Sequence, residues 1–272
     1  MVKIIAVCNQ KGGVGKTTTA VNLAACLAAA EKKTLLLDLD PQANATTGVG
    51  LDKTKVSDSI YQVLLGGRPI TEVIFPTEMP FLSIIPSHYS LAGAEIELVN
   101  VVSRETKLRE SLQVVENNYD FVIIDCPPSL SLLTINAMAA ATGVLIPLQC
   151  EYYAMEGLVD LQRTVHLVNE RLNPNLRVEG IVLTMFDPRN NLSYQVAEEI
   201  KKHFEKSVFN VIIPRNVRLS EAPSHGKPII LYDVKSKGAE SYFELAKEVL
   251  ERSENHRPKK TGEYHDAEQR IG

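Results

Sequence analysis

The feature that most constrains this chain is a glycine-rich loop at residues 11–18, between an apolar run and a segment of helical period. The loop reads Lys-Gly-Gly-Val-Gly-Lys-Thr-Thr, and the apolar run before it covers residues 3–8. Glycines at this spacing let the backbone turn so that several N–H groups face a bound phosphate. The N-terminus of the following helix favours the same negative charge. The loop therefore predicts a strand, a phosphate-binding turn and a helix, in that order.

The loop departs from the general P-loop pattern at one position, because Gln10 stands where that pattern has its first glycine. Lys16 should place its ammonium on the β- and γ-phosphates, Thr17 should complete the coordination of Mg²⁺, and Thr18 should donate to the α-phosphate. The residues expected to hold ATP or ADP here are Gly12, Gly13, Val14, Gly15, Lys16, Thr17 and Thr18. Three glycines can also form a plain strand-to-helix turn, but the Lys-Thr pair that ends the loop favours a nucleotide site.

Three aspartates lie at the carboxyl ends of two further apolar runs. Asp38 and Asp40 end the run at residues 34–39, and Asp125 follows the run at residues 121–124. Open parallel sheets bind ligands at this edge, where an aspartate can hold magnesium through water. An aspartate at a strand end can also cap a turn or a helix. Because all three should converge on the glycine loop, we expect Asp125 to serve magnesium and Asp38 and Asp40 to face the phosphates.

Short apolar runs alternate with longer segments of helical period along the chain. This alternation predicts an α/β fold with a mainly parallel central sheet and helices on both faces, as in P-loop NTPases. The expected strands are residues 3–8, 34–39, 82–85, 121–124, 144–148, 178–184 and 208–213. The expected helices are residues 17–30, 156–172, 193–204 and 239–250. Residues 1–252 should form one ATPase domain, and the polar residues 253–272 should form a disordered tail.

The composition is that of a folded protein in water. Of the 272 residues, 44% are apolar and 23% are charged, and the net charge of -4 argues against a generally basic nucleic-acid coat. No apolar run approaches the roughly 20 residues of a membrane span, and the N-terminus has no signal-peptide pattern. We therefore expect a cytoplasmic protein without a membrane partner. The four cysteines form no Cys-x-x-Cys pair, which indicates reduced thiols in the core.

Together with the glycine loop, four longer strings make the chain resemble the ParA/Soj family of partition ATPases. These strings are LLLDLDPQANATTG, FVIIDCPPS, QCEYYAMEGL and IPRNVRLSEAPSHGKPI, and the similarity extends from residue 2 to about residue 250. The resemblance implies that Lys11 reaches across an ATP-dependent homodimer to the phosphates of the partner. Catalysis by Lys11, Lys16 and Asp40 would then need two chains. The resemblance also implies that Asp40 positions the attacking water and that Asp38 belongs to the magnesium and lysine shell.

Further nucleotide contacts follow from the same resemblance. Glu151 should contact the nucleotide or the partner subunit. Met185, Pro214 and Asn216 should lie near the adenine. Without the resemblance, Met185 would be taken as core filler and Pro214 as a strand terminator.

No DNA-reading motif is found in the sequence, so any DNA binding must use phosphates. The resemblance places Arg189 and Arg218 against double-stranded DNA, without sequence specificity. Lysines that could widen this patch are Lys201, Lys202, Lys206, Lys227, Lys235 and Lys237. Ordinary solvated surface charge is the alternative for each of these residues. The resemblance implies a nucleoid-associated protein whose hydrolysis is stimulated by a ParB-type centromere-binding partner.

Several alternative functions share the glycine loop. A MinD-like positioning ATPase would need a C-terminal amphipathic membrane helix, which residues 253–272 do not encode, and an iron–sulfur carrier would need suitably spaced cysteines. A nucleotide-gated regulator or transcriptional repressor would use ATP only as a switch ligand. The substitution Asp40→Ala distinguishes it from an ATPase, because phosphate release would then be unchanged. A small-molecule ligase on the same fold would need a substrate pocket.

Overall fold

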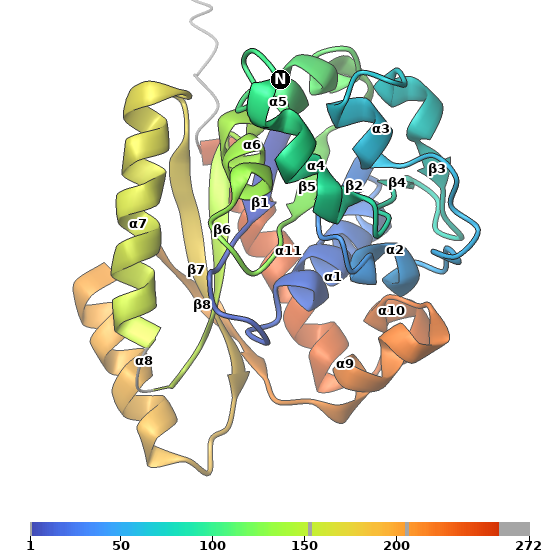
Figure 1. The fold of residues 1–272 in the computed structure, drawn as a ribbon. Coiled ribbons are helices and arrows are strands. Elements are labelled where there is room, and N and C mark those ends of the chain that lie inside the picture. The colour runs from blue at the N-terminus through green and yellow to red at the C-terminus, as the bar shows by residue number, and fades with distance from the viewer. Residues whose placement is uncertain (1, 152–153, 205–206, 256–272) are drawn as a thin grey trace, which may run out of the picture.

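In the described part of the chain, eight strands form one sheet, in which β3 alone runs antiparallel to its neighbour (Figure 1). The structure is a computed structural model and describes residues 2–151, 154–204 and 207–255. The strands are β1 (Lys3–Val7), β2 (Thr34–Asp38), β3 (Phe75–Pro76), β4 (Leu82–Ile85), β5 (Phe121–Asp125), β6 (Gly143–Gln149), β7 (Arg177–Phe186) and β8 (Val208–Pro214). Their order in the sheet is β3-β4-β2-β5-β1-β6-β7-β8. The predicted α/β fold with a mainly parallel sheet is confirmed.

The seven expected strands are present, each with ends that differ from the prediction by at most two residues. Continuous Val, Ile and Leu runs predict such strands well, because both faces of a parallel sheet are covered. The two-residue strand β3 was not predicted, since a segment of that length carries no periodic signal.

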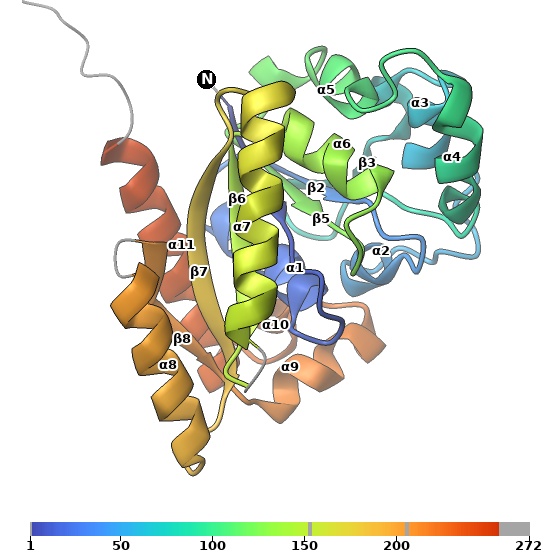
Figure 2. The same cartoon turned by 60° about the vertical axis from the view of Figure 1, so that its left-hand side comes forward.

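Alternate residues of the central strand β1 contribute to two apolar layers. Ile4 and Ala6 belong to the layer that packs against helices α3 to α8, whereas Ile5 and Val7 belong to the layer that packs against α1, α10 and α11. Figures 1 and 2 show these two groups of helices on opposite faces of the sheet. The alternation of side chains along a strand therefore produces two cores, one on each face.

The helices divide into long ones that were predicted and short ones that were not. The long helices are α1 (Lys16–Ala29), α7 (Ala154–Arg171), α8 (Asn191–Phe204) and α11 (Lys237–Asn255). The short ones are α2 (Asn44–Gly48), α3 (Ile60–Leu64), α4 (Leu91–Glu97), α5 (Lys107–Leu112), α6 (Leu132–Ala140), α9 (Val217–Glu221) and α10 (Ile229–Tyr232), with 3-10 turns η1 (Ile70–Val73), η2 (Leu98–Asn100), η3 (Glu116–Asn118) and η5 (Ala222–His225). Fewer than three turns give too few residues for an apolar stripe to stand out in the sequence.

The last helix, α11, runs past the expected domain boundary at residue 252. It continues to Asn255, and the Ser253 hydroxyl accepts a hydrogen bond from Lys3 Nζ at 2.8 Å. The first three residues of the expected tail therefore belong to helix α11, which Ser253 ties to β1. Residues 256–272 lie outside the described residues.

Candidate active site

The glycine loop connects β1 to α1 at the carboxyl edge of the sheet. Gly13 and Gly15 have φ angles of 74° and 87°, in the left-handed region that side-chain-bearing residues seldom adopt. Thr184 Oγ1, near the end of β7, donates to the carbonyl oxygen of buried Val14 at 2.8 Å. The loop is therefore held in a fixed turn from the neighbouring part of the sheet.

A cavity of about 530 Å³ opens over this loop. The loop residues that line it are Gly12, Gly13, Gly15, Lys16, Thr17 and Thr18, and Asp40 lines it from the opposite loop. Val14 is buried beneath the loop and is absent from the lining, so its contribution is to the fold of the turn. A cavity of this size suits a small-molecule ligand or cofactor, and the N-terminal turn of α1 adds backbone N–H groups beside it.

Lys16 lies in the wall of the cavity with only 6% of its surface exposed. Its ammonium donates to the carbonyl oxygen of Lys11 at 2.9 Å. Burial lowers the pKa of Lys16, and the carboxylates of Asp125 and Asp40 oppose this shift. A partly desolvated ammonium held in this way suits an anionic ligand.

Lys11 behaves differently from Lys16. Its side chain is half-exposed, it does not line the cavity, and its ammonium forms an ion pair with Glu151. Glu151 follows β6 and is also absent from the cavity lining. The loop backbone is positioned instead by Asn9, whose Oδ1 accepts a hydrogen bond from Lys11 N at 3.0 Å.

The two aspartates that follow β2 have different surroundings. Asp38 is fully buried: Oδ2 accepts hydrogen bonds from Thr46 N and Thr46 Oγ1, both at 2.7 Å, and Oδ1 accepts one from Asp40 N at 3.2 Å. Burial raises the pKa of Asp38 to about 6, although these hydrogen bonds favour the carboxylate. Asp40 faces the cavity, and its Oδ1 accepts from Gln42 N at 2.9 Å.

Of the two aspartates expected to face the phosphates, Asp40 lines the cavity and Asp38 does not. Strand β2 ends at Asp38, so the alternation that would place both side chains on one face stops there. Asp38 holds the start of α2 instead of lining the cavity.

Asp125 ends β5 directly beside Asp38, its partner in the strand register. Both of its carboxylate oxygens are buried, and neither accepts a hydrogen bond of normal geometry from the described residues. Burial raises the pKa of Asp125 well above its usual value, and the charge of Asp38 adds to that rise. A buried carboxylate that lacks a hydrogen bond of normal geometry, beside Lys16 and Thr17, suits a cation. Among the described residues, no group of three acidic, His or Cys side chains could hold a metal ion without other ligands. This is the arrangement expected for Mg²⁺, which takes most of its ligands from water and phosphate.

The three residues expected near the adenine all line the same cavity. Met185 and Pro214, at the ends of β7 and β8, and Asn216 all line it. Met185 has a φ of 48°, an uncommon backbone conformation for a residue with a side chain. Asn216 caps α9, since its Oδ1 accepts from Arg218 N at 2.9 Å.

Sequence reasoning missed several lining residues. Gln42 and Asn44 follow Asp40, while Ser220, Pro223 and Tyr242 come from α9, η5 and α11. Gln42 and Asn44 stand inside the string LLLDLDPQANATTG and could have been inferred from their place after a strand end. Ser220 and Pro223 stand inside the string IPRNVRLSEAPSHGKPI, whereas Tyr242 lies outside every such string and reaches the cavity only through tertiary packing.

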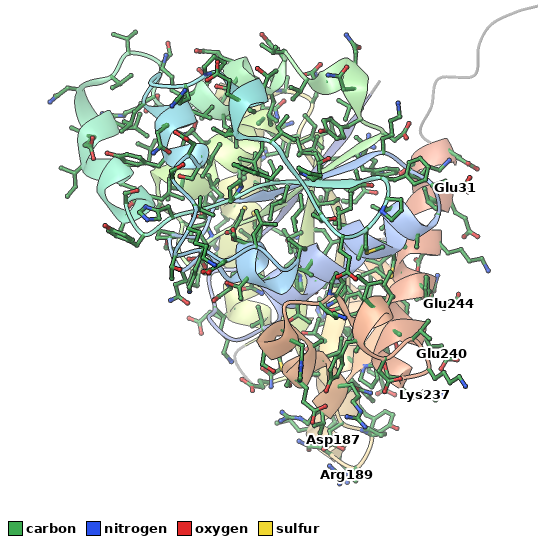
Figure 3. All side chains as sticks on the ribbon, turned by 90° about the vertical axis from the view of Figure 1, so that its right-hand side faces the viewer. Glu31, Asp187, Arg189, Lys237, Glu240 and Glu244 are labelled. Carbon is green, nitrogen blue, oxygen red and sulfur yellow. The ribbon has the colours of Figure 1, made fainter. Side chains whose placement is uncertain are left out.

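The two arginines expected at DNA are both engaged by carboxylates. Arg189 is 85% exposed at the tip between β7 and α8, where its Nε and Nη2 donate to both oxygens of Asp187 at 2.9 and 2.8 Å (Figure 3). Arg218 Nη1 donates to Glu221 Oε2 at 2.9 Å, and its Nε lies 3.4 Å from Asp233 Oδ2. The hydrogen bonds from Arg189 lower the pKa of Asp187, and the hydrogen bond from Arg218 lowers the pKa of Glu221.

The additional lysines differ in their surroundings. Lys237 forms an ion pair with Glu240 at 2.7 Å, and Lys201 and Lys202 lie on the last turn of α8. Lys235 is exposed and Lys227 is half-buried. Lys206 lies outside the described residues.

Comparison with known proteins decides the family. Residues 2–178 match the family described as an AAA domain. Over 258 residues the chain is 57% identical to the chromosome partitioning protein ParA of Myxococcus xanthus, covering 95% of this chain and 91% of that protein. It is 58% identical over 249 residues to the sporulation initiation inhibitor protein Soj of Bacillus subtilis, covering 92% and 98%.

The chain belongs to the ParA/Soj family of chromosome-partitioning ATPases. The resemblance inferred from the motif strings is thereby confirmed. A solved relative is similar to this ParA/Soj chain in fold: cobyrinic acid a,c-diamide synthase from Mycobacterium smegmatis, with bound ADP and magnesium, has a TM-score of 0.83 and 36% identity, covering 94% of this chain and 97% of that chain.

Two further features of this ParA/Soj chain bear on the alternatives. None of the described helices is both long and apolar enough to cross a membrane. Cys8, Cys26, Cys126 and Cys150 are free and buried. They behave as small core residues, as expected.

Proposed function

We propose that this chain hydrolyses ATP, with Mg²⁺ as cofactor, and uses the reaction to segregate DNA. The observation that carries the proposal is a single cavity lined by Lys16 and Thr17 of the glycine loop and by Asp40. When bound, Mg²⁺ would neutralise charge on the phosphates, and Thr17 and Asp125 are the residues that would hold it. The buried, unpartnered oxygens of Asp125 support this assignment.

The side chains around the cavity have distinct roles in this proposal. Lys16 stabilises negative charge on the β- and γ-phosphates. Asp40 orients the attacking water, and the hydrogen bond from Gln42 N restricts the rotation of its carboxylate. Asp38 is a positioning residue, because it binds Thr46 and so holds the loop that carries Asp40 and Gln42. Positioning and charge neutralisation are what phosphoryl transfer requires of a protein.

Lys11 and Glu151 support hydrolysis in a homodimer. The ion pair between them is half-exposed, and exposed pairs contribute little to stability. A phosphate bound by a second chain can therefore replace Glu151 as the partner of Lys11. A cation delivered in this way typically accelerates phosphoryl transfer by roughly 10³ to 10⁵. An isolated chain should accordingly hydrolyse ATP very slowly.

Dimerisation would also create the DNA-binding form. Two copies of Arg189 and Arg218 double the number of phosphates that the protein can neutralise, and each adds about -0.9 to the salt dependence of binding. We infer that the ATP-bound dimer associates with the nucleoid in the cytoplasm through nonspecific contacts to double-stranded DNA. Hydrolysis, stimulated by a ParB-type centromere-binding protein, releases it.

The substitution Asp40→Ala tests the enzymatic part of this proposal. Phosphate release with ATP, Mg²⁺, DNA and a ParB-type partner should fall by about 10² or more, while ADP binding persists. Asp52→Ala is the matched control, because Asp52 lies in a nearby loop, is exposed and does not line the cavity. Sedimentation with ADP and with ATP should show a dimer with ATP only. Unchanged phosphate release in Asp40→Ala would favour the nucleotide-gated regulator instead.

A further inference from the structure

A second cavity adjoins the proposed nucleotide site. Its volume is about 450 Å³, and it lies between the first turns of α1, helix α2 and the segment that follows α9. Thr17, Thr18, Asn44 and Pro223 line both cavities. A group bound in the second cavity would therefore lie beside the proposed nucleotide without occupying the same space.

The charged residues that line this second cavity are all basic. Lys53 and Lys227 are among the residues that line it, and none of the described lining residues is acidic. Lys53 Nζ donates to the carbonyl oxygen of Gln42 at 2.9 Å. Neither lysine takes part in any of the ion pairs found among the described residues.

Three other surface cations are paired where these two lysines are not. Lys55, two residues after Lys53, pairs with Asp52, and both expected DNA arginines pair with carboxylates. Two ammonium groups without carboxylate partners, at the rim of one cavity, form a site for an anion.

The other lining groups are partly polar and partly apolar. The hydroxyls of Thr47 and Ser224 already donate to backbone carbonyl oxygens, at 3.2 and 2.7 Å, so neither has a proton free for a ligand. Thr18 also lines the cavity, and Val21 and Ala222 give it apolar surface. The two lysines suit phosphate oxygens, and the apolar part suits the carbon skeleton of a phosphate ester.

The two loops that carry the lysines are held together by direct backbone contact. A Cβ atom on Gly50 would lie 3.2 Å from the carbonyl oxygen of Gly226, and a Cβ atom on Gly226 would lie 3.1 Å from Gly50 Cα. Only glycine allows this approach without displacement. The relative positions of Lys53 and Lys227 are therefore set by the fold and do not depend on a ligand to bring the loops together.

We propose that the cavity between Lys53 and Lys227 is a second phosphate-binding site, distinct from the ATP site and able to be occupied together with it. The phosphate could belong to a free small molecule, such as a phosphate ester or pyrophosphate, or to the backbone of DNA. This proposal does not depend on hydrolysis at the first site.

The test uses inorganic pyrophosphate as the probe and the full chain saturated with ADP and Mg²⁺, so that the first site is filled. Calorimetric titration should show one pyrophosphate bound per chain. Lys53→Gln combined with Lys227→Gln should weaken this binding by at least about tenfold, whereas Lys55→Gln should leave it unchanged. ADP affinity, measured separately with a fluorescent ADP analogue, should stay within about twofold in all variants, which shows that they fold.

A second arm identifies the source of the phosphate. Binding of duplex DNA in the presence of ATP is compared between wild type and the double variant. Pyrophosphate binding that depends on both lysines, with DNA binding unchanged, supports a free ligand. DNA binding that needs both lysines, without a pyrophosphate site, supports the DNA backbone as the source. Unaltered binding of both probes in the double variant would overturn the proposal.

Discussion

At the scale of single residues, the site is built around carboxylates that the fold buries without neutralising. Neither carboxylate oxygen of Asp125 accepts a hydrogen bond of normal geometry from the described residues, whereas Asp38 beside it is satisfied by Thr46 and Asp40 N. Burial is the largest cause that raises the pKa of both groups, and the charge of Asp38 adds to the rise for Asp125, as the charge of Asp40 does for Asp38. Such a cost in stability is typical of groups kept for function.

Asp125→Asn should stabilise the ligand-free protein and weaken its response to nucleotide. The substitution removes a buried acid whose ionised form the fold disfavours, so at a pH above the pKa of Asp125 the free energy of unfolding should rise on the order of 1 kcal/mol. The rise in Tm that wild type shows with Mg²⁺ and ADP should shrink in the variant. Thermal unfolding measures both effects, and Asp160→Asn on exposed α7 is the control. A destabilised ligand-free Asp125→Asn protein would contradict this account.

Asp38 should make stability depend on pH. Its pKa of about 6 in the folded chain lies above the value of about 3.9 expected when unfolded, so the folded state binds more protons between these values. Its contribution is therefore fully present below about pH 4 and is lost as pH rises through about 6. Asp125 acts in the same direction.

Urea unfolding from pH 4 to pH 8 measures this dependence. The fall in the free energy of unfolding near pH 6 should be smaller in Asp38→Asn than in wild type, and smallest when Asp125→Asn is added. Asp52→Asn, at an exposed position, should retain the wild-type profile. Identical profiles for wild type and the double variant would refute the assignment.

At the scale of elements, the cavity depends on how α9 is packed. Leu219 of α9 lines the cavity and is buried against Gly238 in the first turn of α11. A Cβ atom at Gly238 would lie only 2.7 Å from Leu219 Cγ and 3.0 Å from its Cδ1. The close contact between these two helices therefore determines where the cavity wall that contains Leu219 lies.

Gly238→Ala should displace α9 and weaken nucleotide binding. The overpacked contact should cost about 1–3 kcal/mol in the free energy of unfolding, and ADP affinity should fall because Leu219 moves. Gly157→Ala is the matched control, since Gly157 lies within α7 and a Cβ atom there meets nothing within 4 Å. That control should gain about 0.5–1 kcal/mol with unchanged ADP affinity. Urea unfolding measures the stability of both variants, and ADP titration measures their affinity. Unchanged stability and ADP affinity in Gly238→Ala would contradict this account.

At the scale of the whole molecule, the proposed DNA contacts stand in a chain of negative net charge. Figure 3 shows Asp187 and Arg189 at the end of the molecule, beyond the alternating charges of α11 that include Lys237 and Glu240. The guanidinium of Arg189 already donates two hydrogen bonds to the carboxylate of Asp187, so the pair has little net attraction for phosphate. DNA binding through Arg189 must therefore replace Asp187.

Asp187→Asn should strengthen DNA binding by the ATP-bound protein. Removing the competing charge leaves Arg189 free for phosphate, so affinity should rise and the salt dependence should steepen by about 0.9 for each chain. Filter binding over a range of salt concentrations measures both quantities. Asp160→Asn, which frees Arg163 on exposed α7, should change neither. Weaker binding by Asp187→Asn would mean that Asp187 holds Arg189 in its DNA-binding orientation.

Much of this molecule could be read from local patterns. The seven main strands, the four long helices and the phosphate loop follow from apolar runs, helical period and glycine spacing, because these signals arise from neighbours in the chain. Lys16, Thr17, Thr18 and Asp40 were assigned to the cavity for the same reason: each stands at a fixed distance from a predicted strand end.

Tertiary structure decided the features that depend on contacts between distant segments. Periodicity cannot tell which strand-end carboxylate is sealed from the cavity, so the difference between Asp38 and Asp40 came from the hydrogen bonds with Thr46. The pairing of Lys11 with Glu151 spans 140 residues. The approach of Gly50 to Gly226, which sets the second cavity, is likewise a contact between loops. Local sequence specifies strands, helices and turns, whereas burial and pairing of charge depend on which segments pack together.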